Sequence, residues 1–82
     1  MKLHEVTQGK LEAYEEAILG AGDSVKSAAR FNRLILEAAR DAGIVSGLPD
    51  NLADLKPWQI PEWTEAIVDH ITAAKRPPSE GE

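Results

Sequence analysis

Histidine and carboxylate side chains are the groups of this chain that could do chemistry. A metal site on a helix needs donors three or four residues apart, and at those offsets from His70 the sequence holds only alanine and isoleucine. The other histidine, His4, lies near the opposite end of the chain. Glu62 and Glu65 could form an acid–base pair, but one of them would need a water-shielded pocket to shift its pKa. A chain of 82 residues has little room for such a pocket. We therefore predict no metal, no cofactor and no catalytic residue.

Basic residues at helical spacing suggest a binding site instead. Lys26, Arg30, Arg33 and Arg40 follow one another at offsets of four, three and seven residues, which places them on one face of a helix. Glu37 comes one turn after Arg33, and we expect the two to form an intrahelical ion pair.

Three interpretations of this basic face remain open. It could belong to a small helix-turn-helix-like, DNA-associated regulator, with the Gly-Ala-Gly sequence of residues 20–22 as its turn. It could bind an acidic protein, or it could be a solvated surface. The net charge of −5 disfavours nucleic acid as the partner, because nucleic-acid binders usually carry a basic surplus.

Both tryptophans lie in one segment that also contains two prolines. Trp63 continues into Ile67 at helical spacing, and we expect it to fill the core. Trp58 lies between Pro57 and Pro61, and we expect its ring to be only partly covered. Exposed tryptophans often anchor protein interfaces. The residues that we predict to bind a partner are Trp58, Trp63, Arg30 and Arg33.

Length and composition fit one small domain without disulfides. The chain has 82 residues and no cysteine. Its N-terminus has no apolar signal-peptide core, and no apolar run approaches the roughly 20 residues that span a bilayer. We expect a soluble, cytoplasmic protein with a single domain over residues 1–76.

The pattern of apolar and capping residues predicts an all-α fold. Helices are expected over residues 8–19, 24–42 and 61–75, with one short helical turn over 51–55 capped by Asp50, and a disordered tail over 77–82. Thr7 is the expected N-cap of the first helix, and Asp23 and Ser24 open the second. Gly20 and Gly43 are expected at left-handed C′ positions that end helices, with Ile44 completing a Schellman motif. Lys56 and Ile60 precede prolines and are expected to be extended. No strand is predicted.

The expected buried faces follow from the same spacing. For the first helix they comprise Leu11, Tyr14 and Ile18. For the second they comprise Val25, Ala28, Phe31, Leu34, Ile35, Ala38 and Ala42. For the last they comprise Trp63, Ile67, Ile71 and Ala74, and Leu52 and Leu55 are expected to point inward from the short turn.

Two segments resemble those of a known family. The helix end Ala42-Gly43-Ile44 and the segment Asp54 to Trp58 are similar to those of the small tail-assembly chaperones of long-tailed bacteriophages and prophages. The resemblance covers about Thr7 to Pro78. It implies an all-helical, non-enzymatic protein of the bacterial host cytoplasm that binds a tape-measure or tail-tube protein during tail assembly. It assigns no binding residue.

Overall fold

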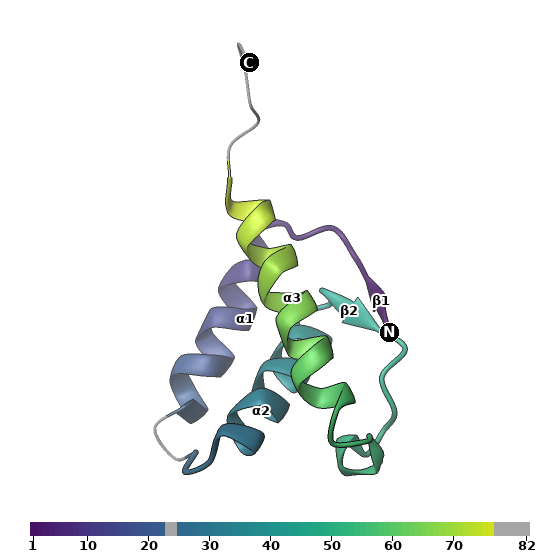
Figure 1. Ribbon diagram of the computed structural model, residues 1–82. Coiled ribbons are helices and arrows are strands. Elements are labelled where there is room, and N and C mark those ends of the chain that lie inside the picture. Colours follow the sequence, from purple (N-terminus) through teal and green to yellow (C-terminus); the bar gives the residue numbers. More distant parts are fainter. Residues whose placement is uncertain (23–24, 77–82) are drawn as a thin grey trace.

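The computed structural model describes residues 1–22 and 25–76, which form three α-helices, one short 3-10 helix and a small sheet (Figure 1). The helices are α1 (Gln8–Ala21), α2 (Ala28–Asp41) and α3 (Gln59–Lys75), and the 3-10 helix η2 is Leu52–Asp54. The strands are β1 (Lys2–Leu3) and β2 (Val45–Ser46). The prediction of a small all-α bundle is confirmed. The predicted tail, residues 77–82, lies outside the described residues.

Helix α1 begins as predicted and ends later than predicted. The Thr7 side chain accepts a hydrogen bond from the backbone N–H of Lys10 at 3.3 Å, as expected of an N-cap. Gly20, predicted to end the helix in a left-handed conformation, is instead helical, and the helix runs to Ala21. A glycine within a helix costs only about 1 kcal/mol relative to alanine, so it does not by itself end one. Gly20 and Ala21 therefore belong to α1 and do not form the Gly-Ala-Gly turn that the helix-turn-helix alternative requires.

Helix α2 begins four residues later than predicted. Ser27 is its N-cap, and the Ser27 hydroxyl accepts a hydrogen bond from the N–H of Arg30 at 3.2 Å. The predicted caps, Asp23 and Ser24, lie outside the described residues. Because the helix starts at Ala28, Lys26 precedes it, and the predicted basic face of the helix loses one of its four members.

The end of α2 is the Schellman motif predicted from Gly43. Gly43 has φ +81°, its N–H donates to Arg40 O at 3.0 Å, and the N–H of Ile44 donates to Ala39 O at 2.9 Å. Both bonds satisfy carbonyl groups that the end of a helix otherwise leaves free. The motif turns the chain sharply, so that Ile44 enters the core directly after the helix.

Three local predictions about the connector between α2 and α3 are wrong. Asn51, rather than Asp50, caps η2, and its side-chain oxygen accepts from Ala53 N at 3.0 Å. Helix α3 starts at Gln59 and not at residue 61, so Ile60, expected to be extended, is helical. Pro61 is still tolerated because the N–H groups of the first helical turn have no intrahelical acceptor to lose.

The structure contains a small sheet, although no strand was predicted from the sequence. Strands β1 and β2 pair antiparallel, with Lys2 opposite Ser46 and Leu3 opposite Val45. Next to this pair, the N–H of His4 donates to Ile44 O at 2.7 Å. Each strand has two residues, which is too short for the alternating pattern that predicts strands from sequence.

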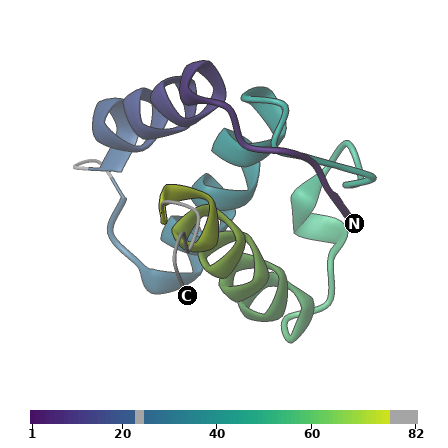
Figure 2. The ribbon, with the colours of Figure 1, turned by 90° about the horizontal axis from the view of Figure 1, so that it is seen from above.

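Helix α2 holds the structure together, because the helix contacts run mainly from it to α1 and to α3. Seen from above, α1 and α3 lie on different sides of α2 (Figure 2). The buried face of α2 differs from the predicted one. Leu36 and Ala39 were not predicted to be buried but are fully buried, and Ala28 and Phe31 were predicted to be buried but are exposed. The buried cluster comprises Ile35, Leu36, Ala39, Ile44, Val45, Leu52, Ile67 and Ile71, and the half-buried residues packed against it include Leu11, Tyr14, Ile18, Leu55 and Trp63.

Candidate protein-binding surface

Trp58 is a large apolar side chain left open to solvent. It is 62% exposed and occupies the N-cap position of α3, where it makes no side-chain capping hydrogen bond. The expectation that its ring is only partly covered is confirmed. A tryptophan in this state has most of its area available to a partner.

Trp63 has a different environment from Trp58. It is half-buried and packs against the core cluster from the first half of α3. On the same helix, the hydroxyl of the buried Thr64 donates to Asn32 O of α2 at 3.3 Å. Trp63 therefore contributes to the contact between α3 and the core, and only part of its ring is available to a partner.

Arg30 and Arg33 share a depression beside the end of α1, which we call the arginine hollow. Its volume is about 440 Å³, and it is lined by Ala21, Val25, Arg30, Arg33, Leu34 and Glu37. Within the described residues, the expected ion pair between Glu37 and Arg33 does not form. The remaining arginine of the predicted face, Arg40, instead pairs with its neighbour Asp41 at 3.4 Å. The arginine hollow is therefore lined by two arginines that form no ion pair with a carboxylate of the described residues.

Arg33 also reaches a second depression, on the side of the tryptophan segment. This proline hollow has a volume of about 500 Å³ and is lined by Ala29, Asn32, Arg33, Ala53, Leu55, Pro57, Ile60 and Pro61. Trp58 lies in the chain between two of these residues, Pro57 and Ile60. The fold thus brings one predicted binding residue, Arg33, to the segment that carries another, Trp58.

A third depression was not predicted from the sequence. This apolar groove, of about 460 Å³, is lined by Tyr14, Glu15, Ile18, Leu19, Phe31 and Ile35 from α1 and α2. Leu19 is 79% exposed and Phe31 39% exposed. The apolar pair Ile18-Leu19 could have indicated this groove from the sequence. Two neighbouring residues cannot both point into the core from one face of a helix, so one of the pair had to be left exposed.

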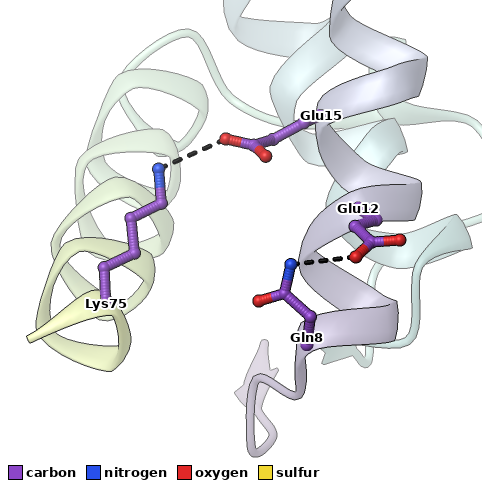
Figure 3. Close-up of polar contacts among 4 residues, drawn as sticks. All are labelled: Gln8, Glu12, Glu15 and Lys75. Atoms are coloured by element: carbon purple, nitrogen blue, oxygen red, sulfur yellow. Dashed lines mark hydrogen bonds and ion pairs between the residues drawn. The ribbon is translucent and has the colours of Figure 1, made fainter. Parts of the chain in front are cut away.

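One charged residue of the apolar groove, Glu15, connects α1 to α3. The carboxylate of Glu15 forms an ion pair with Nζ of Lys75 at 3.3 Å, which links α1 to the end of α3 (Figure 3). One turn earlier, Nε2 of Gln8 donates to the carboxylate of Glu12 at 2.9 Å. Burial, and to a smaller extent the negative charge of Glu15, raises the pKa of Tyr14 above its ordinary value of 10.0.

The two histidines come close together in the fold, where they make structural contacts. Nε2 of His70 donates to the carbonyl oxygen of His4 at 2.7 Å, and Nε2 of His4 lies 2.7 Å from the hydroxyl of Ser46. No group of three or more histidine, cysteine or acidic side chains suited to a metal ion occurs among residues 1–22 and 25–76. In the same residues, no helix combines the length and apolar character needed to cross a membrane.

Comparison of the chain with models of known protein families, with curated proteins and with solved structures finds no match. The interpretation of this surface therefore depends on its own geometry. The apolar groove, the arginine hollow with the adjoining proline hollow, and the exposed ring of Trp58 are the features that it offers to a partner.

Proposed function

We propose that this chain is a non-enzymatic protein-interaction module that binds an apolar helical segment of another protein. More specifically, we propose a tail-assembly chaperone of a long-tailed bacteriophage or prophage, with a tape-measure protein as the partner. The observation that carries the proposal is the apolar groove, in which Leu19 and Phe31 remain exposed beside Tyr14 and Ile18. The finer assignment is supported by the sequence resemblance described above.

The groove has the properties of a surface that receives an amphipathic helix. Helix-in-groove recognition places apolar side chains, repeated every three or four residues, into an apolar depression between two helices. Full burial of one leucine or phenylalanine side chain contributes roughly 1.5–3 kcal/mol, and Leu19 retains most of that potential in the free protein. A few such contacts give reversible binding, as a chaperone that later releases its partner requires.

The exposed carboxylates of α1, one of which lines the groove, fit the same role. Glu12, Glu15 and Glu16 are exposed on α1, alongside the apolar residues that it contributes to the groove. Charges next to a small apolar surface disfavour its association with further copies while leaving it open to a specific partner. A partner helix with basic residues beside its apolar face would complement this arrangement.

Co-expression with a long coiled-coil tape-measure protein tests the proposal. We expect a soluble complex that Leu19→Glu disrupts, because the substitution places a charge in the groove. Val68→Glu is the matched control, since Val68 is also an exposed apolar residue of a helix and lines none of the three depressions described here. Thermal unfolding of both variants separates lost binding from lost fold.

Two results would count against the proposal. If no complex forms at micromolar concentrations of both proteins, the proposal that a tape-measure protein is the partner is wrong. A complex that Leu19→Glu and Val68→Glu weaken equally would show that binding does not use the apolar groove.

A further inference from the structure

Arg33 has a buried guanidinium nitrogen without a hydrogen-bond acceptor. Among the described residues, its Nε is the one buried side-chain nitrogen or oxygen atom that has no partner. Native structures pair nearly all such atoms, and a donor on a charged group is especially unfavourable when left unpaired. Because this nitrogen is buried, an acceptor from outside the chain can reach only the terminal nitrogens of the Arg33 guanidinium group, from the two hollows that Arg33 lines.

No neighbouring carboxylate of the described chain fills that position. Glu37 lines the arginine hollow but forms no ion pair with Arg33 or Arg30. Asp41 pairs with Arg40 and lies more than two helical turns after Arg33. Arg30 likewise has no carboxylate partner in the described residues, so two guanidinium groups line one hollow and neither forms an ion pair with a described residue.

We propose that Arg33, assisted by Arg30, binds the carboxylate of an aspartate or glutamate side chain of the protein partner. This inference deepens the proposed function and depends on its protein-binding role. The two terminal nitrogens of a guanidinium group form a fork that matches the two oxygens of a carboxylate. Bound in this way, the carboxylate neutralises a guanidinium group whose buried Nε has no acceptor.

The position of Arg33 between two hollows defines the partner further. A chain whose carboxylate meets Arg33 can direct a neighbouring side chain into the proline hollow, whose walls are mainly the apolar side chains of Ala53, Leu55, Pro57 and Ile60. From there it reaches the segment that carries the exposed ring of Trp58. At these two hollows, which share no lining residue with the apolar groove, the recognised element is therefore an acidic residue next to an apolar one.

Charge favours a carboxylate over the phosphates of nucleic acid. A DNA-binding surface neutralises several phosphates, which requires a run of cations. Here Lys26 lies before the helix, Arg40 is paired, and Glu37 adds a negative charge to the hollow itself. Two guanidinium groups match one carboxylate of a protein better than a polyanion.

The test follows the Nε–H resonance of Arg33 by nitrogen-15 NMR of the full chain. The probes are a short amphipathic peptide with glutamates beside apolar residues, the same peptide with glutamine in their place, and duplex DNA. We expect the glutamate peptide alone to shift this resonance. Arg33→Gln should weaken its binding about tenfold or more, as expected for the loss of one partner of a desolvated ion pair.

Two further variants make the test specific to this site. Arg40→Gln makes the same change of charge outside the hollow and should leave the affinity for the glutamate peptide unchanged. Glu37→Gln removes the competing carboxylate and should raise that affinity severalfold, which also tests the site if Arg33→Gln fails to fold. Equal binding of the two peptides, a response to duplex DNA alone, or no response to any probe would overturn the inference.

Failure of the inference about Arg33 can be distinguished from failure of the proposed function. A tape-measure complex that Leu19→Glu disrupts and Arg33→Gln leaves intact would support the function and reject the carboxylate site. A glutamate peptide that shifts Arg33, together with a tape-measure protein that does not bind, would support the site and reject the assigned partner.

Discussion

Nε2 of His70 in α3 donates a hydrogen bond of 2.7 Å to the carbonyl oxygen of His4, which lies 66 residues earlier in the chain. On its other side, the N–H of His4 donates to Ile44 O, also at 2.7 Å. His4 is thus held between α3 and the segment after α2. This pair of bonds fixes the N-terminal segment, residues 1–6, across the end of the bundle.

Replacement of His70 should release this N-terminal segment. His70→Ala removes the donor and leaves the His4 carbonyl unpaired, which we expect to destabilise the fold by about 1–2 kcal/mol. His70→Gln retains a donor at a similar reach and should restore much of the loss. Amide hydrogen exchange of His4 checks the prediction, because its N–H should lose protection in the alanine variant. Unchanged protection would show that the strand pairing holds the segment alone.

Two glycines should respond to alanine in opposite ways. Gly20 is helical with open space around it, so Gly20→Ala should stabilise the fold by up to about 1 kcal/mol. Gly43 has φ +81°, so Gly43→Ala should destabilise it by about 1–2 kcal/mol. The added methyl group at Gly43 would meet only the end of Lys10 at 3.6 Å, so the strain is in the backbone. Urea denaturation of both variants measures the difference, and shifts of the same sign would contradict it.

The raised pKa of Tyr14 predicts a loss of stability at alkaline pH. The unfolded chain releases the phenol proton near pH 10.0, whereas the folded chain retains it to a higher pH. The unfolded state then binds fewer protons, so the free energy of unfolding should fall as the pH rises from 10.0 through the folded pKa. Tyr14→Phe should lack this part of the decline. Denaturation of both proteins between about pH 9 and 11.5 provides the comparison, and parallel curves would contradict it.

The two tryptophans should separate binding from stability. Trp58→Ala should change the free energy of unfolding by less than about 0.5 kcal/mol, because most of the ring already contacts water, and should weaken the proposed complex with a tape-measure protein. Trp63→Ala should destabilise the fold by about 2–4 kcal/mol through lost contact with the core. Chemical denaturation and co-purification measure the two effects. Equal destabilisation by both substitutions would contradict this division.

Features that depend on neighbouring residues could be predicted from the sequence. Thr7 caps α1, and Gly43 with Ile44 ends α2, since each motif is completed by hydrogen bonds within a few residues. The helical spacing of Ile67 and Ile71 likewise identified residues that the fold buries. These signals are local, and they were sufficient for the all-α class.

Features that depend on distant residues could not be predicted. The pairing of β1 with β2 joins residues more than forty positions apart through strands too short to show a period. The start of α2 was predicted wrongly for a different, local reason. More than one residue of this segment can cap a helix, and the structure uses Ser27, so the helix starts at Ala28 and Lys26 lies before it.

The candidate binding surface shows the same division. The sequence proposed Arg30, Arg33 and Trp58 as candidates by residue type, and the fold shows that Arg33 lines hollows on two sides. The apolar groove was missed because Leu19 and Phe31 lie on different helices, and the path of the chain between them determines whether their side chains meet.

Helix α1 contains no fully buried side chain, in contrast to α2 and α3. Its attachment depends on a few half-buried residues and on one solvent-exposed ion pair, so less free energy should be needed to detach it than to separate α2 from α3. Under mildly denaturing conditions α1 should therefore detach before α2 and α3 separate. The apolar groove would then lose the residues that α1 contributes, while the contact between α2 and α3 stays buried.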